Sequence, residues 1–237
     1  MSASDAPSGA DSSGESNTDR DSRGADGERP SARRPMSLEE IRGVYADQAD
    51  MMARMAWADR LLAGRYRRRV FERAEGRVLD VACGTGTNVP HLPGSVEYVG
   101  VDLSPEMLAN AEDRFDDLER GDNLLEMDAQ NLAFPDDAFD TVVSSLSTCT
   151  FPDPVAALNE MNRVCKPDGR VLLLEHGRSD LGPIARFQDW RADAHYEKHG
   201  CRWNQDPLES LERSDLEVSY VSTWLAGILT GIRARPA

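Results

Sequence analysis

The chain has 237 residues and a formal net charge of −15, and this length suits one domain with a sizeable core. It contains no run of eighteen apolar residues, so no transmembrane helix is expected. The strongly acidic balance disfavours nucleic acid as a partner, because phosphates would be repelled. The first residues lack the apolar core of a secretion signal, and a cytoplasmic location is therefore expected.

The charge comes from an unusual set of residues. Lys166 and Lys198 are the only lysines, so nearly all positive charge comes from arginine. An acidic, lysine-poor surface belongs either to an ordinary solubilised protein or to a halophilic one, and we favour the halophile. Repulsion among so many carboxylates is tolerated at molar salt, where the Debye length is about 3 Å.

The chain begins with a segment that carries almost no large apolar side chains, residues 1–35. Such a segment cannot bury enough apolar surface to offset the entropy of ordering. It is therefore predicted to be a disordered acidic tail. Residues 36–237 are predicted to form the folded domain.

Residues 36–75 carry the signals of a helical region. Ser37 followed by Glu40 fits a capping box, which marks the start of a helix. Apolar residues then recur at helical spacing, with breaks expected near Gly43 and Gly64. Because these helices precede the first strand, we interpret them as a lid over the site. Simple core packing is the alternative explanation for the same apolar residues.

Beyond this region, strands and helices alternate, which predicts a mostly parallel sheet. The expected strands are residues 77–81, 96–102, 124–127, 139–145, 170–175, 217–224 and 228–235. The expected helices are residues 105–118, 155–164, 183–199 and 207–213, with one helical turn at 89–92. The last two strands form an antiparallel pair. The expected fold is thus a doubly wound α/β domain, Rossmann-like, with a seven-stranded sheet and an antiparallel C-terminal end.

A glycine-rich turn at Gly84 and Gly86 directly follows the first strand. Glycine lets backbone approach a ligand closely, and ligands of open α/β sheets bind at the carboxyl ends of the strands. The third glycine of a dinucleotide fingerprint would stand at Val89, so tight docking of a pyrophosphate is less favoured. Asp80 in the strand–loop corner suits a positive ligand group. Asp102, which ends the second strand, can accept hydrogen bonds from both hydroxyls of a ribose.

Residues 77–176 resemble the core of the class I S-adenosylmethionine-dependent methyltransferases. The matching segments are residues 78–86, 100–104, 127–129, 139–145 and 165–170. The resemblance implies S-adenosyl-L-methionine as the cofactor. The residues that it implies for cofactor binding are Asp80, Ala82, Gly84, Gly86, Asn88, Asp102, Leu103, Asp128, Ala129 and Ser145.

The resemblance also implies individual roles within this set. Asp80 would face the amino-acid end of the cofactor and Asp102 its ribose. Leu103 would lie beside the adenine, and Asp128 would read the adenine amino group. Ala82 stands where the family often has glycine, a departure that a small residue should tolerate.

A looser resemblance covers most of residues 140–220 and concerns the methyl acceptor. Residues 146–150, 175–177 and 200–204 resemble the methyltransferase-like thiol S-methyltransferases, and similar patterns occur in phospholipid N-methyltransferases and quinone-pathway C-methyltransferases. This implies a small-molecule acceptor, hydrophobic or lipid-like, methylated on a thiol, amine or quinone-type carbon. His176 is a candidate catalytic base, substrate hydrogen-bond donor or packed ring. The oligomeric state is not set by the sequence.

No metal site is expected from the cysteines. Cys83, Cys149, Cys165 and Cys201 show no CxxC pairing and no histidine at metal-binding spacing. Two other functional classes stay open. An NAD(P)-dependent oxidoreductase is disfavoured by the missing third glycine and the antiparallel strand pair, and a non-catalytic protein could use the same fold to sense the cofactor.

Overall fold

The computed structural model describes residues 34–117 and 123–237, which belong to one compact unit, Ala32–Ala237. Most of the predicted tail, residues 1–33, lies outside the described residues. Within the described ranges, no helix is long and apolar enough to cross a membrane.

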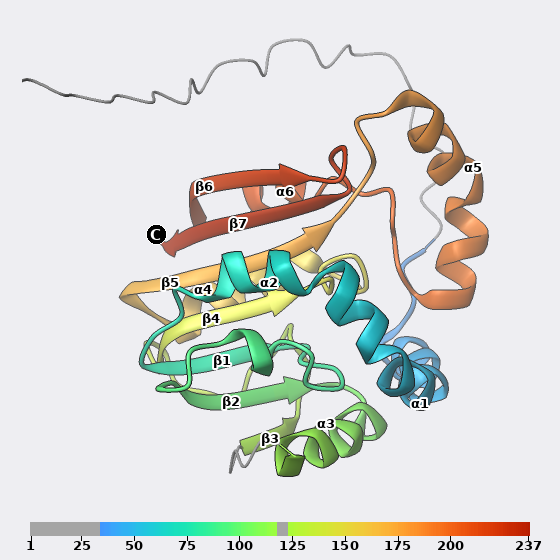
Figure 1. The fold of residues 1–237 in the computed structure, drawn as a ribbon. Helices are drawn as coiled ribbons and strands as arrows, with labels where there is room; N and C mark the ends of the chain where they lie inside the picture. Colours follow the sequence, from blue (N-terminus) through green and yellow to red (C-terminus); the bar gives the residue numbers. More distant parts are fainter. Residues whose placement is uncertain (1–33, 118–122) are drawn as a thin grey trace, which may run out of the picture. The chain divides into compact units, whose positions relative to one another are not determined.

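A seven-stranded sheet with the order β3-β2-β1-β4-β5-β7-β6 forms the centre of the unit (Figure 1). The strands are β1 Arg77–Val81, β2 Glu97–Asp102, β3 Asn123–Glu126, β4 Phe139–Ser145, β5 Cys165–His176, β6 Leu216–Trp224 and β7 Leu229–Pro236. The first five run parallel, whereas β7 pairs antiparallel with both β5 and β6. The predicted mostly parallel sheet with an antiparallel end is confirmed. The strand order reverses between β1 and β4, which creates the switch point where such folds bind ligands.

Helices cover both faces of this sheet. They are α1 Leu38–Leu62, α2 Gly64–Phe71, α3 Pro105–Asp117, α4 Pro154–Val164, α5 Gly182–His199 and α6 Pro207–Glu212, with a 3₁₀ turn at Val89–His91. One buried cluster joins the sheet to α4 and α6 through Leu158, Met161 and Leu211. A second cluster on the other face includes Phe71 of α2 and Phe115 of α3. The two clusters make the domain doubly wound.

Most predicted elements agree with the structure to within one or two residues, and β5 is the main exception. It begins at Cys165, although residue 170 was the expected start. Cys165 pairs with Phe139, and after an irregularity Arg170 pairs with Thr141. The intervening Lys-Pro-Asp-Gly segment has the composition of a turn, so local sequence concealed this first pairing.

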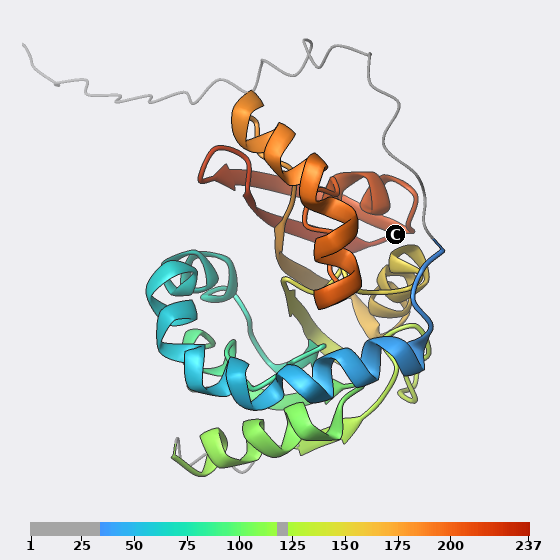
Figure 2. The ribbon, with the colours of Figure 1, turned by 90° about the vertical axis from the view of Figure 1, so that its right-hand side faces the viewer.

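The start of α1 is confirmed, but one expected break is wrong. The Glu40 amide donates to Ser37 Oγ at 3.2 Å, and the Ser37 amide donates to Glu40 Oε2 at 2.7 Å, which completes the capping box. α1 continues without interruption through Gly43 and ends before Gly64. One glycine costs a helix only about 1 kcal/mol, and packing of α1 against α3, visible in Figure 2, offsets that cost.

Candidate functional site

A cavity of about 260 Å³ lies at the carboxyl ends of the central parallel strands. The arrowheads of these strands point toward the side where α1 and α5 lie (Figure 1). The predicted cofactor-binding residues that line the cavity are Ala82, Gly84, Asp102, Leu103, Asp128, Ala129 and Ser145. The structure thus brings together residues from the ends of four different strands. Three other members of the predicted set, Asp80, Gly86 and Asn88, are buried and are not among the lining residues.

The glycine loop after β1 is held by the acid at the end of β2. The Gly84 amide donates to Asp102 Oδ2 at 2.8 Å, and the Ser104 amide donates to Oδ1 at 2.9 Å. Burial raises the pKa of Asp102 above its ordinary value, while these backbone hydrogen bonds act in the opposite direction. Asp102 therefore both shapes the loop and presents a carboxylate to the cavity.

Backbone geometry explains the small residues of this loop. Gly86 has φ +72°, and a Cβ there would lie 2.9 Å from the ring of Phe115 on α3. Ala82 has φ +54°, a left-handed conformation that favours glycine. Such strain persists only where the surrounding structure enforces it, and it concentrates at functional sites.

Asp80 is fully buried beneath the cavity. Asn88 Nδ2 donates to Asp80 Oδ1 at 2.9 Å, and Tyr98 Oη donates to Oδ2 at 3.0 Å. Burial raises the pKa of Asp80 to about 7. Asp80 therefore reaches the site through Asn88, whose Oδ1 accepts from Ser145 Oγ at 2.7 Å.

This burial predicts a pH-dependent stability for the cofactor-free protein. Between the ordinary value of 3.8 and about 7, the folded chain holds a proton on Asp80 that the unfolded chain has released. The free energy of unfolding should therefore fall as pH rises through this window. Asparagine does not titrate, so the Asp80→Asn variant lacks this loss of stability. In urea unfolding, the free energy of unfolding of the variant should therefore rise relative to that of the unsubstituted protein from about pH 4 to 7. The exposed Asp168→Asn is the matched control, and parallel pH profiles for Asp80→Asn and the unsubstituted protein would contradict the assignment.

Arg67 on α2 belongs to the same network, although the sequence analysis did not select it. Its side chain is only 3% exposed and lines the cavity. Nε donates to Asn88 Oδ1 at 2.9 Å and lies 3.3 Å from Ser145 Oγ, while a terminal nitrogen pairs with Asp59 at 2.5 Å. In sequence Arg67 stands among three other arginines of α2, and nothing local distinguishes it.

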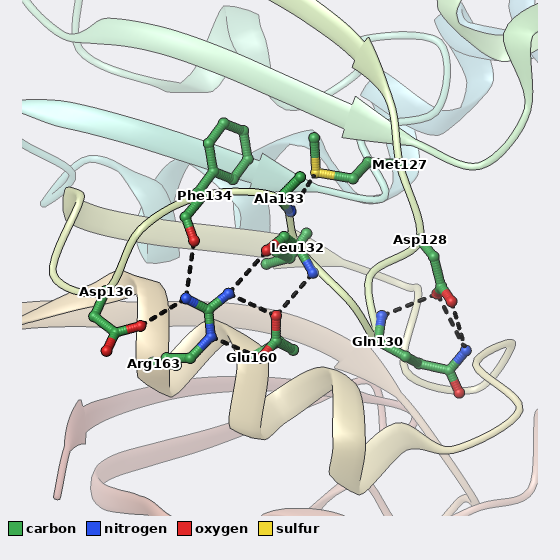
Figure 3. Close-up of polar contacts among 9 residues, drawn as sticks. All are labelled: Met127, Asp128, Gln130, Leu132, Ala133, Phe134, Asp136, Glu160 and Arg163. Carbon is green, nitrogen blue, oxygen red and sulfur yellow. Dashed lines mark hydrogen bonds and ion pairs between the residues drawn. The ribbon is translucent and has the colours of Figure 1, made fainter.

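The loop after β3, which carries Asp128, is anchored to α4 (Figure 3). Arg163 donates to the carbonyls of Leu132 and Phe134, both at 2.8 Å. Arg163 also forms an ion pair with Glu160 at 2.8 Å, and Glu160 Oε2 accepts a hydrogen bond from the backbone amide of Leu132 at 2.8 Å. Gln130 in turn holds the Asp128 carboxylate. Its backbone amide donates to Asp128 Oδ1 at 2.9 Å, and its side-chain Nε2 donates to the same oxygen at 3.1 Å. Asp128, the acid expected to bind the adenine amino group, therefore lies in a loop that hydrogen bonds attach to α4.

His176, the candidate base, ends β5 but is not among the residues that line the cavity. Its Nε2 lies 3.3 Å from Cys149 Sγ and 3.3 Å from Cys201 Sγ. Hydrogen bonds from Cys149, and then from His176 and His195, lower the pKa of the Cys201 thiol. The neighbouring Glu175 is fully buried, and burial raises its pKa to about 7. The structure thus brings Cys149, His176 and Cys201 together, although their spacing in the sequence indicated no common site.

The sequence family described as "Methyltransferase domain" matches residues 79–173. The chain is 37% identical over 163 residues to the phosphatidylethanolamine N-methyltransferase of Cereibacter sphaeroides. The aligned region covers 63% of this chain and 78% of that protein. It is 33% identical over 183 residues to the mitochondrial methyltransferase OMS1 of Saccharomyces cerevisiae, covering 67% of this chain but only 38% of the relative. A demethylmenaquinone methyltransferase of Thermus thermophilus is 41% identical over 119 residues, 47% of this chain and 54% of that protein.

Solved structures share the fold at low sequence identity. A chain from the complex between the Haloferax volcanii Trm112 methyltransferase activator and a methyltransferase superposes with a TM-score of 0.67 at 18% identity, over 81% of this chain and 97% of that one. Geranyl diphosphate C-methyltransferase from Streptomyces coelicolor, solved with S-adenosyl-L-homocysteine, gives 0.65 at 13% identity, over 84% and 98%.

The doubly wound sheet and the cavity at its switch point define a Rossmann-like domain that binds a nucleoside-containing cofactor. With the sequence relatives above, the chain belongs to the class I S-adenosylmethionine-dependent methyltransferases, and its cofactor is S-adenosyl-L-methionine. The protein is therefore assigned to the methyltransferases, and its relatives favour this class over an NAD(P)-dependent oxidoreductase.

Proposed function

We propose that the cavity binds S-adenosyl-L-methionine along the ends of β2, β1 and β4. Asp102 accepts the ribose hydroxyls, Leu103 packs against the adenine and Asp128 accepts from its amino group. Ala82 and Gly84 allow the backbone to approach the methionine part, and Asp80, Gly86, Asn88 and Ser145 maintain this geometry. The support is that seven predicted residues line one cavity, and that Asn88 and Asp80 are joined by hydrogen bonds to the lining residue Ser145.

To this set we add Arg67 as the partner of the methionine carboxylate. Its guanidinium lines the cavity beside Ser145, the last residue of β4. A buried arginine fork suits a carboxylate because it can donate two parallel hydrogen bonds. Asp59 and Asn88 hold the guanidinium in place before the cofactor arrives.

Residues 36–75 form a lid in this proposal. α1 crosses the cavity and contributes Ile41, Tyr45, Met52 and Met55 to its lining. Met55 lines the cavity and is also 50% exposed, so this part of α1 lies between the cavity and solvent. Methyl transfer is an in-line displacement at a sulfonium, for which alignment of the reactants supplies roughly 7–11 kcal/mol. A lid that excludes water and orients the acceptor would supply that alignment.

The acceptor we propose is a lipid-like amine. The observation that carries this proposal is the apolar, exposed surface of the two helices at the strand ends. Trp57 on α1 and Phe187 and Trp190 on α5 are all more than half exposed, with Trp190 at 74%. An amine needs only to lose its ammonium proton, for example to water, before its lone pair can attack the methyl group, whereas a carbon acceptor needs a base in the site, and His176 does not line the cavity. The Cereibacter relative, a phosphatidylethanolamine N-methyltransferase, agrees with this choice.

Transfer of labelled methyl from S-adenosyl-L-methionine tests this proposal. Vesicles of phosphatidylethanolamine, a demethylated quinone and an alkyl thiol are offered separately, and Asp102→Ala sets the background. We expect label on the phospholipid amine. Label on the quinone or thiol alone would replace the amine with that acceptor, and absence of transfer to all three would contradict a lipid-like acceptor.

We also propose that the protein works in a cytoplasm of high salt. The charge of −15 with only two lysines supports this. Because salt screens carboxylate repulsion, the melting temperature should rise steadily as KCl increases from low to molar concentration. Thermal melts measure this directly, and a melting temperature that does not respond to KCl would contradict the proposal.

A further inference from the structure

Three side chains from separate segments meet next to the cofactor cavity, and none is used by the proposed methyl transfer. Cys149 lies in the loop between β4 and α4, His176 ends β5, and Cys201 follows α5. The histidine Nε2 is 3.3 Å from each of the two sulfur atoms, and the three atoms all lie within 4.8 Å of one another. Cys149 is fully buried and the other two are partly buried.

These separations match those of a tetrahedral thiolate–imidazole metal site. Zn²⁺ binds sulfur at about 2.3 Å and imidazole nitrogen at about 2.0–2.1 Å. Tetrahedral angles then place sulfur about 3.6 Å from nitrogen and the two sulfurs about 3.8 Å apart. The observed nitrogen–sulfur separations of 3.3 Å differ from this by only a few tenths of an ångström. An ion could enter with small movements of side chains alone.

The backbone holds these side chains in place. Gly200, with φ +64°, ends α5 in the left-handed conformation and directs the chain into Cys201. The next amide, that of Arg202, donates to the carbonyl of Cys149 at 3.1 Å, which ties the two cysteine segments together. His176 is paired with Leu229 of β7. The segments that supply the three side chains are therefore fixed before any ion binds.

The surroundings also suit a bound cation. Metal-binding histidines commonly fix their tautomer through a hydrogen bond of the other ring nitrogen, and here Nε2 is the nitrogen that faces the two sulfur atoms. Two thiolates and a neutral imidazole would compensate a divalent ion completely, so the complex could be buried without net charge.

We propose that Cys149, His176 and Cys201 bind a thiophilic divalent cation, with Zn²⁺ as the reference ion and water in the fourth position. Soft thiolate ligands with an imidazole select such ions over Mg²⁺ or Ca²⁺. Binding displaces the thiol protons, and no oxidant or reductant takes part. The ion joins the β4–α4 loop, the end of β5 and the start of the segment after α5. It thereby stabilises one wall of the cavity, whichever acceptor the enzyme uses.

Metal content of the reduced, full-length protein tests the proposal without any activity assay. We expect about one Zn²⁺ per chain after dialysis and, with Co²⁺ in its place, the intense d–d absorption of a tetrahedral thiolate site. Zn²⁺ should also protect Cys201 from alkylation in the unsubstituted protein. Cys149→Ala and Cys201→Ala should each weaken binding at least about tenfold, a loss that even the outer partners of metal ligands can cause.

The matched control is Cys165→Ala. Cys165 is also a buried cysteine of the sheet, 1% exposed, but it lies at the other end of β5. It should keep full metal content. Failure of the reduced, unsubstituted protein to bind Zn²⁺ or Co²⁺ would overturn the proposal even if the variants do not fold. So would metal binding that survives both cysteine substitutions, or a Cys149–Cys201 disulfide in a protein that binds no metal when reduced.

Discussion

Replacing Asp102 with alanine should weaken binding of S-adenosyl-L-methionine by about 1–3 kcal/mol, roughly 5- to 150-fold in Kd. The carboxylate lines the cavity, and both of its oxygens already hold backbone amides of the loop, those of Gly84 and Ser104. The substitution therefore removes the proposed acceptor of the ribose hydroxyls and frees the loop at the same time. Titration calorimetry measures the change in Kd.

Asp168→Ala is the control for this measurement, because Asp168 is exposed in the turn segment of β5, away from the cavity. Its Kd should equal that of the unsubstituted protein. Asp102→Asn retains one acceptor oxygen and should lie between the two. A Kd for Asp102→Ala within twofold of the unsubstituted value would contradict the ribose assignment.

Replacing Arg67 with alanine should lower both cofactor affinity and stability. Hydrogen bonds to a charged partner contribute about 1.5–3 kcal/mol, so Kd for S-adenosyl-L-methionine should rise roughly tenfold or more. The free energy of unfolding should fall by about 1–3 kcal/mol, which is less than for a fully buried ion pair, because the partner Asp59 is 31% exposed. Arg67→Lys keeps the charge but not the planar fork and should give an intermediate affinity.

A fragment of the cofactor separates carboxylate binding from a general loss of structure. 5′-Methylthioadenosine lacks the methionine carboxylate, so its Kd should change little in Arg67→Ala. Arg68→Ala is the matched control, since Arg68 is the exposed neighbour on the same helix. Equal losses of affinity for fragment and cofactor would contradict the proposed contact with the carboxylate.

Local sequence pattern and the ends of strands carry the information for the elements that were predicted correctly. The capping box at Ser37, the strand ending in Asp102 and the turn at Gly84 are local features, and each predicted element was found. The expected break at Gly43 was wrong because packing of α1 against α3 outweighs the propensity of one glycine. Only tertiary contacts showed that Asp80 is hydrogen-bonded to Asn88.

The sequence by itself determined the order of strands and helices, the acids at the strand ends and the membership of a methyltransferase family. The elements follow from periodicity, and the acids meet because the carboxyl ends of parallel strands lie at one edge of the sheet. The family membership rests on similarity to known methyltransferases. Only the tertiary structure joined Arg67 to Ser145, 78 residues apart, and His176 to Cys149 and Cys201, 27 and 25 residues apart. Such contacts depend on how separate segments fold back on one another, and spacing along the chain contains no record of that.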